Sequence, residues 1–284
     1  MAIKRIGIIG SGIMGSGIAE VAASTGHTVV LRSRSIDSAN AMLAGLQKSL
    51  ARQVEKGRRE QADADAIAAR VTATADLADL ADCDLVLESV VEDLDVKLAL
   101  FRELDGIVKA DAIIATNTST LPVVEMAMAT NRPGKVCGVH FFNPAPAMSL
   151  VEIVRPMTAD DATIAEVTAF AQACGKDPVE VADRAGFIVN ALLFPYLNNA
   201  VKLLENGIAT RDDIDTAMKG GCNFPMGPLQ LLDLVGLDTS VAILDALYDE
   251  FRDPNFSPAP RLRRMLTAGH LGRKSGIGFY DYRK

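Results

Sequence analysis

IGIIGSGIMGSGIAEVAASTG, residues 6–26, predicts how the chain begins to fold: a short apolar strand, a glycine-rich turn and an amphipathic helix. Its glycines have the spacing GxGxxG, which is a weak signal alone and a strong one between a strand and a helix. The first glycine allows the tight bend, the second lets a pyrophosphate approach the backbone, and the third lets helix and strand pack closely. The residues expected to contact a dinucleotide here are Gly10, Gly12, Ile13, Met14 and Gly15.

Short apolar runs and amphipathic stretches alternate on both sides of this turn. Strands are expected at residues 6–9, 28–31, 85–90, 112–115, 136–142 and 150–154. Helices are expected at residues 13–24, 37–56, 93–108 and 160–174. Because apolar strands joined by crossover helices form parallel sheets that are covered on both faces, the sequence predicts an α/β fold with a Rossmann-type doubly wound sheet.

The pattern changes near residues 183–186. From there on, stretches such as FIVNALLFPYLNNAVKLLENG have helical periodicity, and no convincing strand follows. We therefore expect two domains. Residues 1–184 should form the NAD(P)-binding Rossmann-type domain, and residues 185–284 should form an all-helical C-terminal domain.

Composition argues against several classes of protein. A net charge of −7 disfavours a nucleic-acid partner. The four cysteines are widely spaced and form no CxxC pair, so we expect neither a metal site nor a disulfide framework, and a reducing, cytoplasmic location. The opening MAIKRIGIIG is too quickly broken by glycine for a signal peptide, and no apolar run approaches the ~18 residues of a membrane span.

The end of the second expected strand bears on the choice of nucleotide. A carboxylate commonly stands there and binds the adenosine ribose hydroxyls. In this chain Arg32, Ser33 and Arg34 follow the strand, and the first acid is Asp37. A serine hydroxyl and a guanidinium can bind a 2′-phosphate that a carboxylate would repel. Ser33 and Arg34 therefore favour NADP(H) slightly, and NAD(H) stays open, since both arginines could be solvated loop residues.

Two polar residues interrupt the apolar runs of VHFFNPAPAMSLVEIVRP, residues 139–156. His140 stands beside Val139 and Phe141, and Glu152 stands between two more apolar residues. Burying an unpaired polar group costs roughly 2–7 kcal/mol, and a charge costs more. A histidine that exchanges protons needs a carboxylate to fix its tautomer and balance its charge. Residue type and spacing alone leave a catalytic pair and a structural core pair about equally open.

Further motifs follow one another along nearly the whole chain. They are NTST at 117–120, GVHFFNP at 138–144, DRAGFIVN at 183–190, FPMGP at 224–228, DLVGLDT at 233–239 and GRKSGIGFY at 272–280. In these motifs the chain resembles the 3-hydroxyacyl-CoA dehydrogenases, and among them most closely the bacterial 3-hydroxybutyryl-CoA dehydrogenases.

The resemblance implies reversible oxidation of a (3S)-hydroxyacyl-CoA to a 3-oxoacyl-CoA with a nicotinamide cofactor. It implies that His140 is the base and that Glu152 orients it. It also implies that Ser119 and Asn190 hold the C3 oxygen of the substrate, although a helix N-cap serine and an ordinary helix asparagine are the bland alternatives. The matching positions near the nicotinamide half of the cofactor are Glu92, Lys97, Asn117 and Asn143.

The helix expected at residues 37–56 carries an apolar stripe at Met42, Leu46, Leu50 and Val54. Ser49, Arg52 and Lys56 form a neighbouring stripe at i+3 and i+4 spacing. A solvated basic face is the usual interpretation of such a run. The resemblance implies instead that this helix binds coenzyme A, with Ser49 and Lys56 at matching positions, and Arg52 is added because it lies between them on the same stripe. The resemblance also implies that the C-terminal domain serves substrate binding and homodimer formation, although its apolar runs could be internal core.

Two other functions remain to be weighed. A dehydrogenase for a free hydroxy acid would have no use for the basic stripe. A catalytically silent nucleotide-binding protein would have no use for the His140–Glu152 pair. The leading hypothesis from the sequence is an acyl-CoA oxidoreductase acting on acetoacetyl-CoA and 3-hydroxybutyryl-CoA.

Overall fold

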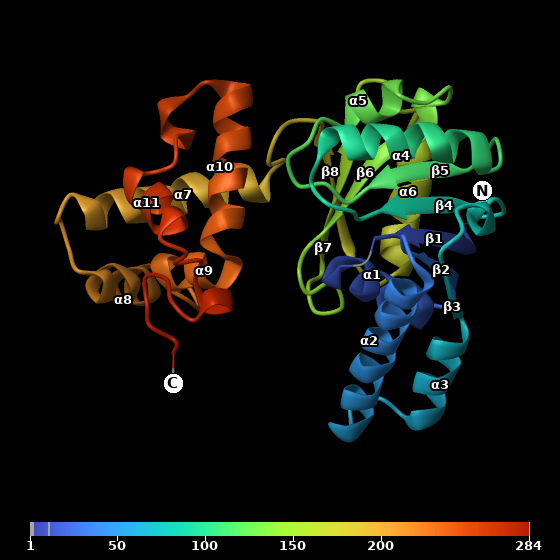
Figure 1. The fold of residues 1–284 in the computed structure, drawn as a ribbon, viewed down its shortest axis with the longest axis horizontal. Helices are drawn as coiled ribbons and strands as arrows, with labels where there is room; N and C mark the ends of the chain where they lie inside the picture. The colour runs from blue at the N-terminus through green and yellow to red at the C-terminus, as the bar shows by residue number, and fades with distance from the viewer. Residues whose placement is uncertain (1–2, 11, 284) are drawn as a thin grey trace. The chain divides into compact units, whose positions relative to one another are not determined.

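A computed structural model describes residues 3–10 and 12–283 of the chain (Figure 1). The chain divides into two compact units, Met1–Asp183 and Arg184–Lys284. Each unit has its own hydrophobic core, so the two are described separately.

The first unit is built on one eight-stranded sheet with the strand order β3-β2-β1-β4-β5-β6-β7-β8. All neighbouring strands run parallel except β6 and β7, which are antiparallel. The chain crosses over between β3 and β4, so the order reverses between β1 and β4, where open α/β sheets bind ligands. The strands are β1 (Arg5–Ile9), β2 (Thr28–Arg32), β3 (Val71–Thr74), β4 (Leu85–Glu88), β5 (Ile113–Thr116), β6 (Val136–Phe141), β7 (Leu150–Arg155) and β8 (Asp177–Ala182).

Helices cover both faces of this sheet (Figure 1). The bounds are α1 (Ile13–Ser24), α2 (Ile36–Glu55), α3 (Gln61–Ala69), α4 (Leu94–Ile107), α5 (Val123–Met128) and α6 (Asp161–Ala173), with short 3₁₀ turns at Ala78–Leu80 and Pro133–Lys135. The predicted fold class is therefore confirmed. The structure adds two strands that the sequence analysis did not predict, β3 and β8.

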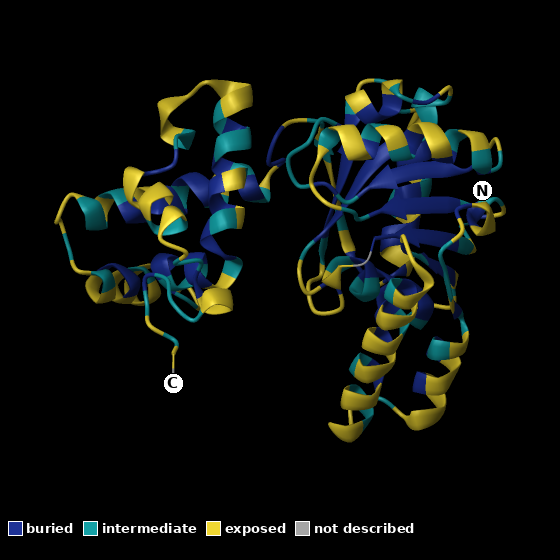
Figure 2. Cartoon of the chain, viewed as in Figure 1, coloured by how far each residue is buried: buried dark blue, intermediate teal, exposed yellow. Residues whose placement is uncertain are grey.

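The alternation of side chains along each strand decides what each face contains. On one face, Ile6 and Ile8 of β1 and the matching positions of the other strands form a core with α1, α2, α3 and α6. Figure 2 shows the central strands buried and the outer faces of the helices exposed. The stripe predicted on α2 belongs to this core, since Met42, Leu46 and Leu50 are buried.

The opposite face, beneath α4 and α5, carries polar residues at the strand ends. Glu88 of β4, Thr116 of β5 and His140 of β6 lie one position out of step with the core residues of their strands. In the antiparallel pairing of β6 and β7, His140 stands directly opposite Glu152. The sheet thus collects these polar side chains on one face.

The second unit is helical, as expected from its sequence. Its helices are α7 (Val189–Glu205), α8 (Arg211–Cys222), α9 (Pro228–Val235), α10 (Leu237–Phe251) and α11 (Pro260–Thr267), with 3₁₀ turns at Pro254–Phe256 and Arg273–Ser275. Apolar residues from these helices form its core. Across the described residues of both units, no helix combines the length and apolar character that a bilayer crossing requires.

Candidate active site

In the glycine turn between β1 and α1, two glycines lie against neighbouring backbone and a third has open space beside it. Gly10 has φ +138°, and a Cβ there would lie 2.1 Å from the carbonyl oxygen of Ser89. A Cβ on Gly15 would lie 2.8 Å from the carbonyl oxygen of Gly10. A Cβ on Gly12 would meet no atom of the described chain within 4 Å. Of these three glycines, Gly12 at the start of α1 is the one with open space around it in the described part of the chain.

The N-terminus of α1 is free of side-chain capping. Its N-cap residue is Gly12, no side chain of the described residues hydrogen-bonds there, and the first turn holds no acid. Ile13 is 77 % exposed, while Met14 packs partly against the core. The first amides of α1 thus face a region that could accept an anion.

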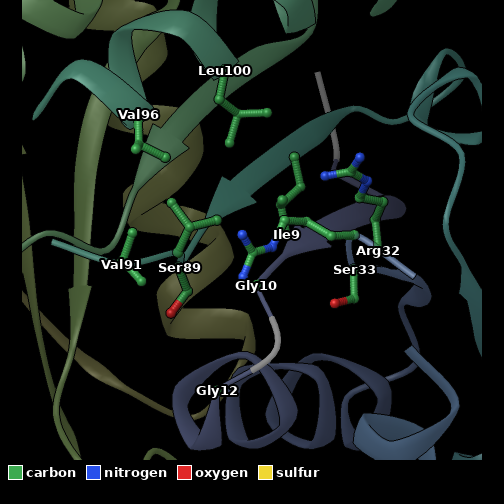
Figure 3. A pocket seen from close by; sticks show the side chains of 11 residues that line it. Ile9, Gly10, Gly12, Arg32, Ser33, Ser89, Val91, Val96 and Leu100 are labelled. Atoms are coloured by element: carbon green, nitrogen blue, oxygen red, sulfur yellow. The ribbon is translucent and has the colours of Figure 1, made fainter. Parts of the chain in front are cut away.

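Beside this turn lies a cavity of about 460 Å³ (Figure 3). Val91, Val96 and Leu100 form an apolar side of the cavity, and Arg32 and Ser33 stand on the side of β2 (Figure 3). Arg34 also lines it. An apolar wall, a polar end beside β2 and the uncapped start of α1 are the kinds of group that bind a dinucleotide, so the residues present fit this group.

The ribose end of the cavity holds two cations and a hydroxyl. The Nε of Arg32 donates to the carbonyl oxygen of Ala75 over 3.3 Å. Ser33 is buried, and its Oγ accepts a hydrogen bond from Ser38 Oγ at 2.6 Å. Arg34 is exposed. Among the described lining residues there is no carboxylate.

His140 lies within hydrogen-bond distance of two polar side chains. Its Nδ1 is 2.8 Å from Glu152 Oε2, and its Nε2 is 3.1 Å from Ser119 Oγ. His140 and Glu152 are 4 % and 1 % exposed, so water screens this contact little. A carboxylate only accepts hydrogen bonds, so this contact favours the tautomer with its proton on Nδ1, and Nε2 then faces the Ser119 hydroxyl as an acceptor.

A second network, buried at Lys97 and Glu88 and exposed at Glu92, lies next to this pair. The Lys97 ammonium is 1 % exposed and lies 2.6 Å from Glu88 Oε1 and 3.4 Å from Glu92 Oε2. Glu88 also accepts a hydrogen bond from Thr116 Oγ1 at 2.8 Å. Glu92 accepts hydrogen bonds from the Ser119 amide at 3.0 Å and from the Thr118 hydroxyl. The backbone that carries Ser119 is therefore tied to Lys97 through Glu92.

The three asparagines predicted as site residues, Asn117, Asn143 and Asn190, lie in different parts of the structure. Asn117 follows β5, and its Oδ1 accepts from the Phe141 amide at 2.8 Å, which links the ends of β5 and β6. Asn143 is exposed in the loop after β6, before Pro144. Asn190 belongs to the second unit, where it is buried in the first turn of α7. The structure thus brings together Ser119, His140, Glu152, Glu92 and Lys97 within the first unit.

The predicted coenzyme A residues lie along α2. Ser49 and Arg52 line a cavity of about 470 Å³ that Lys48 and Glu55 also line. Ser49 and Ile13 line a second cavity, of about 310 Å³, which is bounded by the loop residues 144–146. Lys56 is the exposed C-cap residue of α2. Lys48 was not predicted, although it is one more cation on the same helix.

Glu88 is the buried site residue that sequence reasoning missed. It ends the run LVLE, which is otherwise apolar, so a carboxylate with 0 % exposure stands at the carboxyl end of a central parallel strand. That placement, at the edge where such sheets bind ligands, is the signal that could have found it.

Comparison with known proteins assigns both units to one family. Residues 5–184 match the NAD-binding domain of 3-hydroxyacyl-CoA dehydrogenase, and residues 186–282 match its C-terminal domain. The matched segments meet within a few residues of the division between the two units.

Full-length relatives agree with this assignment. The chain is 47 % identical over 287 residues to a 3-hydroxybutyryl-CoA dehydrogenase of Mycobacterium tuberculosis, covering 99 % of each chain. It is 41 % identical to a mitochondrial hydroxyacyl-coenzyme A dehydrogenase of Sus scrofa, covering 99 % of this chain and 92 % of that one. The crystal structure of (S)-3-hydroxybutyryl-CoA dehydrogenase PaaH1 from Ralstonia eutropha superposes with a TM-score of 0.97 at 41 % identity, over 100 % of both chains. The chain therefore belongs to the 3-hydroxyacyl-CoA dehydrogenase family of oxidoreductases, and its first unit is that family's nicotinamide-dinucleotide-binding domain.

Proposed function

We propose that this protein is a 3-hydroxybutyryl-CoA dehydrogenase that interconverts (3S)-3-hydroxybutyryl-CoA and acetoacetyl-CoA. The observation that carries the proposal is the buried His140–Glu152 pair, with a 2.8 Å contact at Nδ1 and the Ser119 hydroxyl 3.1 Å from Nε2. Names of relatives on whole-chain matches support the four-carbon substrate. When bound, the nicotinamide would exchange a hydride with C3 of the substrate.

The protein's own part in this reaction is to move one proton. In the oxidative direction, His140 Nε2 accepts the proton of the C3 hydroxyl, and the resulting imidazolium keeps its Nδ1 proton bonded to Glu152. The buried carboxylate balances the new positive charge in a medium that screens it weakly. The Ser119 hydroxyl, 3.1 Å from Nε2, is placed to donate a hydrogen bond to the C3 oxygen. By family likeness, the Asn190 amide supplies a second donor to this oxygen.

The direct test mixes the protein with acetoacetyl-CoA and a reduced nicotinamide nucleotide and follows nicotinamide absorbance. The wild type should turn over, and His140→Ala should lose about 10²–10⁴-fold in kcat while it still binds the nucleotide. His270→Ala is the matched control and should keep wild-type turnover. Unchanged turnover in His140→Ala, or activity with free acetoacetate but not with its CoA ester, would overturn the proposal.

We further propose that NADP(H) is preferred over NAD(H). The two guanidiniums and the Ser33 hydroxyl at the ribose end of the cavity support this preference, because they suit a 2′-phosphate. Arg34→Ala should lower kcat/KM for NADPH by roughly tenfold and change that for NADH little, as expected for one lost phosphate contact worth about 1.4 kcal/mol. Arg102→Ala, on the exposed side of α4, is the control. A wild-type preference for NADH would refute this assignment.

We propose that coenzyme A binds along α2, at Ser49, Arg52 and Lys56. The cavities on this helix, which both include Ser49, support the proposal. Lys56→Ala should raise KM for acetoacetyl-CoA and leave KM for the nucleotide nearly unchanged, because the lost cation faces only the CoA phosphates. If neither constant moved, Lys56 would be a solvated residue.

We propose a homodimer formed through the helical unit. Leu192 and Leu203 are 72 % and 45 % exposed and lie three turns apart on one side of α7, with Tyr196 between them. An apolar stripe of this kind suits a second copy of the same helix. Light scattering should give twice the chain mass for the wild type and a smaller mass for Leu192→Asp. A monomeric wild type would exclude the dimer.

We also propose the cytoplasm as the working compartment. Cys83, Cys137 and Cys174 are buried free thiols, and burial raises the pKa of Cys83 and Cys174 to about 11 and of Cys137 to about 12. The exposed Cys222 is a free thiol too, and four free thiols without a disulfide suit a reducing environment.

A further inference from the structure

Lys176 is a buried cation whose bonds run to one loop. It lies between α6 and β8, is 8 % exposed, and its Nζ donates to the carbonyl oxygens of Ala145 and Met148, both at 2.7 Å. Burial lowers the pKa of this ammonium. Burying an ammonium costs several kcal/mol unless its partners compensate it. The partners of Lys176 are two neutral backbone carbonyls, so its burial points to a role for the segment that it binds.

The loop that Lys176 holds lies between the two members of the proposed proton relay. It joins β6, which carries His140, to β7, which carries Glu152. The amides of Ala147 and Met148 both bond the carbonyl oxygen of Pro144, at 2.9 and 3.1 Å. The loop is thus a closed turn, and Lys176 is the side chain that fastens it to the α6–β8 connection.

The same loop forms a wall of a cavity in the proposed coenzyme A groove. Pro144, Ala145 and Pro146 line the cavity of about 310 Å³ opposite Ser49 of α2. On the α1 side the loop has little room, since a Cβ on Gly17 would lie 3.3 Å from both Ala145 Cβ and Pro146 Cδ. The loop thus packs closely against α1 and accepts two hydrogen bonds from Lys176, and both contacts restrict the position of this wall.

We propose that Lys176 is a positioning residue that holds the loop at residues 144–148 as a fixed wall for the acyl-CoA substrate. This inference rests on the proposed function and deepens it. Lys176 touches neither His140 nor Glu152 in the contacts above; it acts through the loop. Loosening the loop therefore weakens substrate binding while the proton relay keeps its 2.8 Å contact.

The test compares two variants. Lys176→Met keeps a long unbranched side chain but has no hydrogen-bond donor, and Lys176→Arg restores donors. Lys176→Met should raise KM for acetoacetyl-CoA roughly tenfold, with kcat within about twofold and nucleotide KM unchanged, because uniform substrate binding is what it removes. Lys176→Arg should recover most of the loss. Lys109→Met removes a lysine that pairs with Asp84, outside the loop, and controls for general destabilisation.

Hydrogen exchange gives a second readout that a general loss of stability would not produce. In Lys176→Met the amides of Ala147 and Met148 should exchange faster, while those of β1 and β4 keep wild-type rates. A wild-type KM in Lys176→Met, or a fall in kcat with KM unchanged, overturns the inference while the proposed function stands. A wild type that cannot reduce acetoacetyl-CoA overturns the proposed function, and this inference with it.

Discussion

At the scale of the residue, the contact that matters most is the one between His140 and Glu152. The two stand opposite each other because β6 and β7 pair antiparallel, with His140 in register with Glu152. The motif could predict both residue types, and twelve positions separate them. That they face each other depends on the register of the hairpin, which a single-residue slip would destroy by turning one side chain to the other face.

Glu152→Gln tests what the carboxylate does for this histidine. A glutamine amide can donate to Nδ1 and so favour the tautomer that has its proton on Nε2, where the base must be free. Turnover should fall roughly 10²- to 10⁴-fold with nucleotide affinity unchanged. Glu180→Gln, on the neighbouring strand β8 and paired only with Arg155 at the surface, is the matched control and should retain activity.

The buried ion pair between Lys97 and Glu88 allows a prediction about the free energy of unfolding. Lys97→Met leaves the Glu88 carboxylate buried without its cation, which should destabilise the protein by about 3–5 kcal/mol. Adding Glu88→Gln to this variant should recover part of the loss, since the buried charge is then gone. Urea unfolding followed by circular dichroism measures both. Equal stability of the single and double variants would mean that the two side chains do not depend on each other.

The Glu88–Lys97 contact also marks a limit of prediction from the sequence. Lys97 could be matched to a family position, but Glu88 reads as the last residue of an apolar strand. Nine positions and a strand-to-helix connection separate them, so no helical or strand periodicity places one beside the other. The Lys97 ammonium reaches the Glu88 carboxylate because the fold places α4 next to the end of β4.

Among the structural elements, the glycine turn between β1 and α1 contains glycines with two different roles: Gly12 leaves room for a ligand, and Gly10 allows the backbone to bend. Gly12→Ala adds a methyl group that would meet none of the described residues within 4 Å, so stability without nucleotide should stay close to that of the wild type. The same methyl group would occupy the space of the pyrophosphate and should raise nucleotide KM at least tenfold. Gly10→Ala should instead lower Tm, because its Cβ would collide with the Ser89 carbonyl at 2.1 Å and its φ is +138°.

Thermal unfolding and nucleotide titration of both variants distinguish these effects. If Gly12→Ala binds nucleotide like the wild type, the pyrophosphate does not approach the backbone at this turn. If Gly10→Ala keeps the wild-type Tm, the turn can relax and its glycine is dispensable for folding.

The strands that the sequence could predict are those with buried, continuous apolar runs, such as β1, β4 and β5. The strand β8, with the sequence DPVEVA, mixes acids with valines and is half exposed along its length, so it lacks the run that marks a central strand. The strand β3 has only four residues, VTAT, of which two are threonines, so it also lacks a long apolar run. Both strands lie at the edges of the sheet, where one side is unpaired and burial is less demanding.

At the scale of the whole molecule, the change of pattern near residue 184 has a counterpart in two separate cores. The sheet core and the helical core share no residue. The chain also distributes its chromophores unevenly: it has no tryptophan, and its four tyrosines, Tyr196, Tyr248, Tyr280 and Tyr282, all lie in the second unit. Tyrosine fluorescence therefore reports on the helical unit alone.

Two buried carboxylates bind the C-terminal segment of that unit: Asp215 accepts a hydrogen bond from the Tyr280 hydroxyl at 2.7 Å, and Asp233 accepts several. Asp233 of α9 is 1 % exposed and accepts hydrogen bonds from the amides of Phe279 and Tyr280, both at 2.8 Å, and from the Tyr282 hydroxyl at 3.1 Å. A Cβ on Gly278 would lie 2.0 Å from Asp233 Oδ1. Despite these donors, burial raises the pKa of Asp233 above its ordinary value.

This shift predicts how the helical unit responds to pH. Because the folded state holds the Asp233 proton more tightly than the unfolded chain does, the contribution of this group to stability is full below the unfolded pKa of about 3.9 and declines as pH rises through the folded pKa. Asp233→Asn cannot titrate, so the stability of the wild type relative to this variant should fall over that interval and be constant above it. Urea unfolding followed by tyrosine fluorescence at several pH values measures the difference in the unit where it arises. A difference that grows with pH would mean that the hydrogen bonds from Phe279, Tyr280 and Tyr282 outweigh burial, and that Asp233 fastens the C-terminal segment as a stable anion.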